Sequence, residues 1–281
     1  MRERCWFIPE QVLKGKLPYR NSETFYGPPN PFLLAVVYYI GGIGLTPERA
    51  TGFAYRLIFL GAMFCLARRW NSTVASGCTL FAALFLVSLG VAAYAWTGRL
   101  ACALCSIYLL AQAESRQCGR GRCQWRASLP CGFWSRRNVV SITGFLAIRR
   151  REKLWYLFGA AAGLFPLGCL ILVTGPQPVL ENLFVFPVLQ SSASRHIRSQ
   201  LWKSRLSFFA HLTACLINLV AGWRAIRVDP GNVGARMLLA AALLGLGLSH
   251  QAAQRLDTTH LLFAAVVSLG LAPLSLFILL P

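Results

Sequence analysis

The stretch His260–Leu280, HLLFAAVVSLGLAPLSLFILL, decides the fold class of this chain. It contains no Asp, Glu, Lys or Arg, and as a helix it would cover about 30 Å, the thickness of the hydrocarbon core of a bilayer. Leu154–Thr174 and Thr79–Thr97 are equally free of charge. These runs lack the alternation of barrel strands, and helices satisfy their own backbone in hydrocarbon. We therefore expect an all-α, polytopic integral membrane helix bundle.

The composition excludes a soluble globular domain. Hydrophobic residues make up 56% of the chain and charged residues only 13%, whereas soluble domains contain about 25% charged residues. The net charge of +19 is explained by cytoplasmic loops and contacts with lipid headgroups. Because the arginines lie between apolar runs, without a DNA- or RNA-binding motif, we expect membrane lipid as a partner and no nucleic acid. Residues 1–20 have no apolar core, so we expect no cleavable signal peptide.

The ten cysteines do not form a metal-binding pattern. Most of them lie within apolar runs, where Cys behaves as a small hydrophobe. Cys118, Cys123 and Cys131 lie in a polar stretch, but their spacing is irregular and no His is near them. The sequence therefore identifies no metal ligands and predicts no cofactor.

The apolar segments lie near 32–45, 52–67, 77–97, 100–112, 154–175, 206–226, 235–250 and 260–280. The first is shorter than the roughly 17 residues needed to cross a bilayer, so we expect it to be an interfacial helix. That leaves about seven spans. We expect a single membrane domain over 1–281: an outer loop with the interfacial segment (1–50), a transmembrane part (51–112), a basic cytoplasmic loop (113–153) and a second transmembrane part (154–281).

The distribution of Lys and Arg predicts the orientation, because cytoplasmic loops carry an excess of both. The stretch 113–153 is the most basic part of the chain and is assigned to the cytoplasm. Counting spans in both directions then places the Arg68-Arg69 pair inside, together with Arg224, Arg227 and Arg236. Residues 1–30, 176–205 and 255–257 fall on the outer face. We expect a multi-pass protein of a plasma membrane, or of the inner membrane if the source is bacterial.

Two stretches on the outer face contain residues suited to chemistry. In Arg255-Leu256-Asp257-Thr258-Thr259-His260, Arg and His together can hold a phosphate, with Asp257 orienting either of them. An equally good interpretation is a polar helix start, capped by Asp257 or Thr258. The N-terminal stretches Leu13–Arg20 and Thr24–Pro31 combine Pro and Gly with Tyr and Arg, which suits a shaped rim. The alternative there is an ordinary loop with aromatic anchors at the interface.

The stretches VLKGKLPYR (12–20) and YGPPNPFLLA (26–35) resemble the first outer loop of membrane-embedded GT-C glycosyltransferases. These are the dolichyl-phosphate-mannose mannosyltransferase-like enzymes of glycosyltransferase family 39. Weaker similarities to the same family lie in Tyr55-Arg56-Leu57, Leu66–Arg69, Glu181-Asn182-Leu183 and Arg255–Leu261. The family has an acidic pair before its first outer loop. Here the chain starts too late for that pair, so the resemblance implies an N-terminally truncated relative.

The resemblance implies transfer of a sugar from a polyprenyl-phosphate donor on the extracytoplasmic face. In such enzymes a carboxylate of the first outer loop is the general base, and basic residues hold the leaving phosphate. Carried over by position, Glu3 is the nearest carboxylate, Arg255 and His260 lie on the phosphate side, and Tyr19, Arg20 and Tyr26 line the entrance.

Two other functional classes stay open. A catalytically inactive membrane scaffold would explain the missing acidic pair. A transporter needs ionisable or polar residues along a path through its spans, and the span interiors offer only Arg56, His211 and Asn218.

Overall fold

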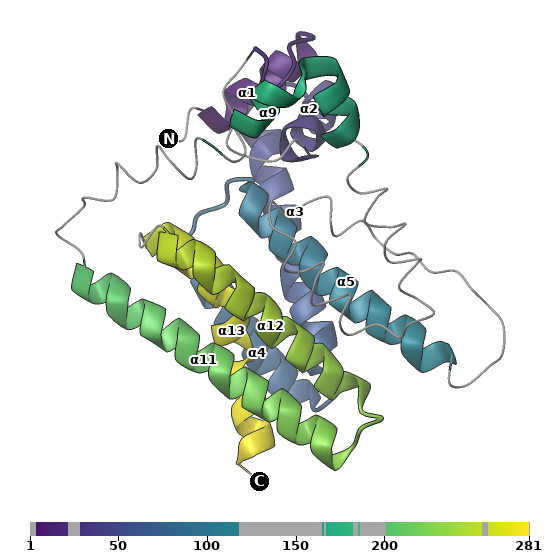
Figure 1. The fold of residues 1–281 in the computed structure, drawn as a ribbon, viewed down its shortest axis with the longest axis vertical. Coiled ribbons are helices and arrows are strands. Elements are labelled where there is room, and N and C mark those ends of the chain that lie inside the picture. The colour runs from purple at the N-terminus through teal and green to yellow at the C-terminus, as the bar shows by residue number, and fades with distance from the viewer. Residues whose placement is uncertain are drawn as a thin grey trace.

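The computed structural model describes residues 4–21, 29–117, 165, 167–181, 185, 201–254 and 258–280. Within these ranges the regular elements are α-helices, which confirms the all-α class. They are α1 (Arg4–Leu13), α2 (Pro29–Gly41), α3 (Leu45–Ala67), α4 (Ser72–Val87), α5 (Ala95–Gln117), α9 (Pro176–Leu180), α11 (Leu201–Val228), α12 (Val233–Gln254) and α13 (Thr258–Leu279). Figure 1 shows α3, α4, α5, α11, α12 and α13 as a bundle with α1, α2 and α9 gathered above it.

Among the described residues, three helices are long and apolar enough to cross a membrane: Leu45–Ala67, Arg205–Val228 and Thr259–Leu279. Two shorter apolar helices cover Ser72–Val87 and Val233–Ser249. The expected number of about seven spans is therefore supported only for these three. Segment 154–175 lies largely outside the described residues, although 167–174 is helical.

The sequence predicts one span over the apolar run 77–97, but the structure divides this run between two helices. Helix α4 ends at Val87, and α5 begins at Ala95 after a loop of residues 88–94. Gly90 takes a positive φ of 66°, a conformation that suits glycine. Helix α3 begins at Leu45, before residue 50, and α5 continues to Gln117, past residue 112. Hydropathy cannot reveal such a break, since the loop is as apolar as the helices around it.

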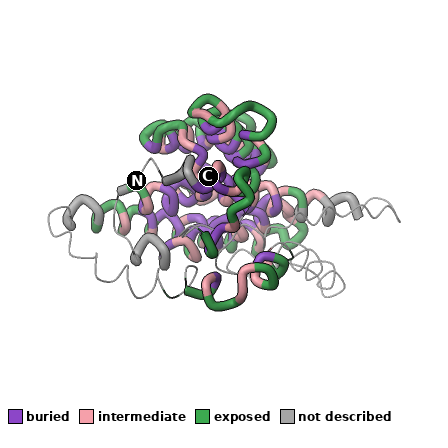
Figure 2. The backbone as a smooth tube through the Cα atoms, turned by 90° about the horizontal axis from the view of Figure 1, so that it is seen from above, coloured by how far each residue is buried: buried purple, intermediate pink, exposed green. Residues whose placement is uncertain are grey.

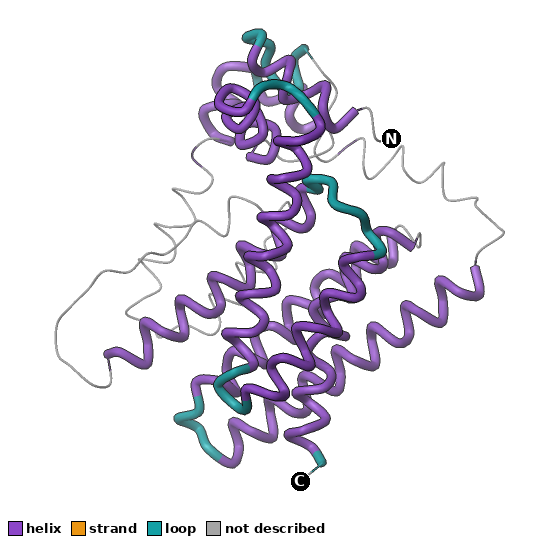
Figure 3. The backbone as a smooth tube through the Cα atoms, turned by 180° about the vertical axis from the view of Figure 1, so that it is seen from behind, coloured by secondary structure: helices purple, strands orange, loops and turns teal. Residues whose placement is uncertain are grey.

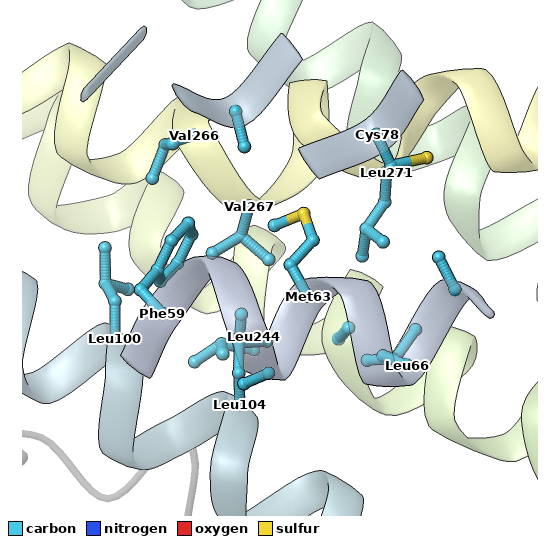
Figure 4. Close-up of a cluster of buried hydrophobic side chains, with 14 of the residues drawn as sticks. Phe59, Met63, Leu66, Cys78, Leu100, Leu104, Leu244, Val266, Val267 and Leu271 are labelled. Atoms are coloured by element: carbon cyan, nitrogen blue, oxygen red, sulfur yellow. The ribbon is translucent and has the colours of Figure 1, made fainter. Parts of the chain in front are cut away.

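The main core lies where α3, α4, α5, α12 and α13 meet. Figure 4 shows Phe59 and Met63 of α3 between side chains of the other helices, including Leu104, Leu244 and Val267, all at most 1% exposed. In Figure 2 the buried stretches gather in the middle of the bundle, with exposed stretches around it. One face of α11 stays exposed and apolar, with Phe209, Leu216, Val220 and Trp223. An exposed apolar stripe along a helix of this length suits contact with lipid.

The bundle has two chemically different ends. The cap end comprises α1, α2, α9, the 88–94 loop and the N-termini of α3, α5 and α13. The basic end comprises the turns 68–71 and 229–232 and the C-terminus of α13. At the basic end, the Arg224 guanidinium donates to the Leu279 carbonyl at 3.2 Å, and Gly234 lies against the Trp70 indole. Arg68, Arg69, Arg224, Arg227 and Arg236, assigned above to one side of the membrane, thus lie at one end.

Candidate functional site

A buried polar clamp at the cap end fixes the loop between α4 and α5. Arg56 of α3 donates to the Gly52 carbonyl at 2.8 Å, to the Ala92 carbonyl at 3.3 Å, and to the Gly90 carbonyl. The Glu48 carboxylate accepts the Ala93 amide at 2.7 Å. These contacts satisfy backbone groups of a loop whose first residues, Leu89 and Gly90, donate to carbonyls in the last turn of α4. Figure 3 shows this loop in teal at the cap end.

Helix α2 reaches the same loop through Asn30. Its amide donates to the Ala93 carbonyl at 3.4 Å, and the Tyr55 hydroxyl donates to its Oδ1 at 2.9 Å. The clamp therefore joins α2, α3 and the 88–94 loop, which leads into α5.

The first turn of α5 then meets the first turn of α13. The rings of Trp96 and His260 lie edge to face at 6.4 Å between centroids, and Phe263 stacks with Trp96 at 6.3 Å. The Arg99 guanidinium lies over the Trp96 ring, 5.4 Å from its centroid. Arg99 and His260 thus lie at the N-terminal turns of α5 and α13, where the helix dipoles carry partial positive charge.

Two candidate residues of the N-terminal stretch, Tyr19 and Arg20, differ in burial. Tyr19 is only 4% exposed and packs against Leu170 and Val179. It has a φ of 71°, unusual for a residue with a side chain. Tyr19 therefore packs residues 17–19 against the chain around α9. Arg20 beside it is exposed.

Several predicted residues lie outside the described residues: Glu3, Tyr26, Arg255 and Asp257, and also Cys118, Cys123 and Cys131. In the described part of the chain, no group of three or more His, Cys, Asp and Glu residues is placed to hold a metal ion. Of the predicted phosphate-side residues, His260 alone can be placed.

A second polar cluster lies inside the bundle, between α11, α12 and α13. His211 is fully buried, with Nδ1 2.7 Å from the Ser268 hydroxyl and Nε2 2.9 Å from the Ser249 hydroxyl. Asn218 donates to the Ser268 carbonyl at 2.9 Å and accepts from Ser275 at 2.7 Å. These side chains bind one another between helices, as polar residues do where helices pack in membranes.

The contacts of Arg56, His211 and Asn218 weaken the transport interpretation. Each of these buried side chains forms hydrogen bonds with protein groups inside the bundle. A transport path needs groups that exchange partners with a passing ion or solute.

Sequence reasoning missed Trp96 and Arg99. Trp96 was placed inside the supposed span 77–97, and Arg99 lay between two supposed spans without a role. A Trp and an Arg three residues apart, at the start of an apolar helix, form a pattern that is typical of anchoring at a membrane interface.

In comparisons with protein-family models, curated proteins and solved structures, no match to this chain was found.

Proposed function

We propose that this chain is a multi-pass membrane protein that binds a polyprenyl-phosphate-linked sugar at the cap end and transfers the sugar as a GT-C-like glycosyltransferase. One observation carries the proposal: Arg99 and His260 flank Trp96 where the N-termini of α5 and α13 meet. The resemblance of residues 12–35 to the first outer loop of that family concerns the same end of the molecule. It supplies the class of substrate.

The chemistry of such a transfer needs a cation near the leaving phosphate. As the bond between sugar and phosphate breaks, negative charge grows on the phosphate oxygens. Arg99 and His260 supply donors for that charge, and the helix N-termini add to the positive field. Trp96 touches both side chains and is a positioning residue. The exposed apolar faces of the bundle suit the polyprenyl tail, which stays in the bilayer.

The test is the binding of a polyprenyl-phosphate hexose to the full chain in lipid nanodiscs. We expect Arg99→Gln to raise the Kd at least about tenfold, because a hydrogen bond to a charged group contributes about 1.5–3 kcal/mol. His260→Gln should weaken binding in the same direction. The matched control is Arg49→Gln, which removes an exposed cation from the first turns of α3, at the same end. Equal affinities for the Arg99 and Arg49 variants would contradict the site.

Transfer is measured separately, as release of polyprenyl phosphate in the presence of acceptor glycans or peptides. Turnover that is lost in the Arg99 variant supports the enzyme. Binding without turnover removes the catalytic half of the proposal and favours the inactive scaffold.

A further inference from the structure

The basic end gathers cations from connections that are far apart in the sequence. Arg68 and Arg69 directly follow the end of α3. Arg224 and Arg227 lie in the last turns of α11, and Arg236 lies in the first turn of α12. The contact of Arg224 with the Leu279 carbonyl ties this group to the end of α13.

Acidic residues do not neutralise this group within the described chain. Asp229 is the nearby carboxylate, and its Oδ1 accepts the Gly231 amide at 2.9 Å, which closes the turn between α11 and α12. Arg68, Arg69, Arg224 and Arg227 are exposed and form no salt bridge with the other described residues. The end therefore presents a concentrated positive charge.

Apolar and aromatic side chains border these cations. The Arg227 guanidinium lies 4.8 Å from the centre of the Trp223 ring, and that of Arg69 lies 5.9 Å from Tyr108. Val228 is 80% exposed and Leu280 is 70% exposed at the same end. A cation beside an exposed apolar surface and an indole ring fits the headgroup region of a bilayer, where acyl chains meet phosphates.

We infer that the basic end is a binding surface for anionic phospholipid headgroups of the leaflet that it faces. Arg224 and Arg227 lie on successive turns of α11, so their guanidinium groups can hold neighbouring phosphates. The exposed apolar residues beside them contact the acyl chains of the same lipids. This surface lies at the opposite end from Arg99 and His260 and does not depend on the proposed transfer.

The experiment measures phospholipid retained by the purified full chain. The protein is equilibrated with mixed micelles holding equal amounts of phosphatidylglycerol and phosphatidylcholine, and retained lipid is counted by native mass spectrometry. We expect enrichment of phosphatidylglycerol, reduced more than tenfold in Arg224→Gln/Arg227→Gln, because each surface cation contributes roughly fivefold.

Two further variants make the outcome decisive. Arg49→Gln/Arg205→Gln removes the same charge from exposed positions near the other ends of α3 and α11 and should leave the enrichment unchanged. Arg224→Lys/Arg227→Lys keeps the charge, and its enrichment should stay within a few-fold of the parent. The inference would be overturned if both Gln pairs lost phosphatidylglycerol enrichment equally, or if Arg224→Gln/Arg227→Gln left the enrichment unchanged. A complete loss of enrichment in the Lys pair would also overturn it.

Discussion

Gly52 is the residue on which the geometry of the cap end depends most closely. A Cβ at this position would lie 2.2 Å from the Val91 carbonyl oxygen, so α3 and the 88–94 loop touch backbone to backbone. We expect Gly52→Ala to cost about 1–3 kcal/mol of stability, since the added carbon must push the loop away from Arg56. Thermal unfolding in detergent micelles measures this loss.

The matched control for Gly52 is Gly61, which lies in the same helix and has open space around its Cβ position. Gly61→Ala should leave stability within about 0.5 kcal/mol or raise it slightly, because Ala favours helix. Similar losses in the two variants would show that the close approach at Gly52 is not what holds the loop.

The sequence shows that Arg56 is an unusual charge within an apolar helix, but it does not show its partners. Gly90 and Ala92 lie more than thirty residues further along, in a stretch with the hydropathy of a span. The same limit applies to Arg99, because Trp96, which it contacts, meets His260 of the last helix. The sequence likewise does not show that Tyr19 packs against Leu170 and Val179, which lie about 150 residues further along the chain.

At the scale of the helices, His211 is the buried link among α11, α12 and α13. The Ser268 hydroxyl also donates to the Ala265 carbonyl at 3.1 Å, and the Ser249 hydroxyl donates to the Gly245 carbonyl at 3.3 Å. The two ring nitrogens of His211 therefore join hydroxyl groups that are themselves bonded to α13 and α12. We expect His211→Ala to lower stability by about 1–3 kcal/mol, because two interhelical hydrogen bonds and packing are lost.

A double-mutant cycle tests this link. Ser268→Ala should cost about 1 kcal/mol alone and much less in the His211→Ala background, because its partner is already gone. Ser76→Ala serves as the control, since Ser76 is exposed on α4 and its hydroxyl donates to the Ser72 carbonyl of its own helix. Additive losses for His211 and Ser268 would mean that they do not act as one unit.

The sequence predicts the helices best where apolar residues run long between polar ends. Segments 52–67, 206–226 and 235–250 fall within helices of the structure, and segment 260–280 extends one residue past the end of α13. The prediction fails at 77–97, because distant groups in α2 and α3 satisfy a loop backbone that hydropathy cannot distinguish from helix. The short helix α2 matches the expected segment near 32–45, and its place at a membrane interface stays a prediction.

At the scale of the whole molecule, the charge pattern and the packing agree. The positive-inside rule placed Arg68, Arg69, Arg224, Arg227 and Arg236 on one side without knowledge of any contact, and the helices bring them to one end. Trp96 and His260 lie at the other end, with α1, α2 and α9. We therefore expect the two ends of the bundle to face opposite sides of a membrane.

The most direct measurement is protease access in sealed, oriented vesicles. The recognition sequence of a site-specific protease is inserted at the exposed residues Arg20-Asn21, at the cap end, or at Asp229-Pro230, at the basic end, because exposed turns tolerate insertion. Before this test, the thermal unfolding midpoint of each insertion variant must equal that of the unmodified protein. We predict that protease added to the cytoplasmic side cuts only the protein with the 229–230 site, and that protease added to the outer side cuts only the protein with the 20–21 site. Cleavage of both proteins from the same side would contradict the account.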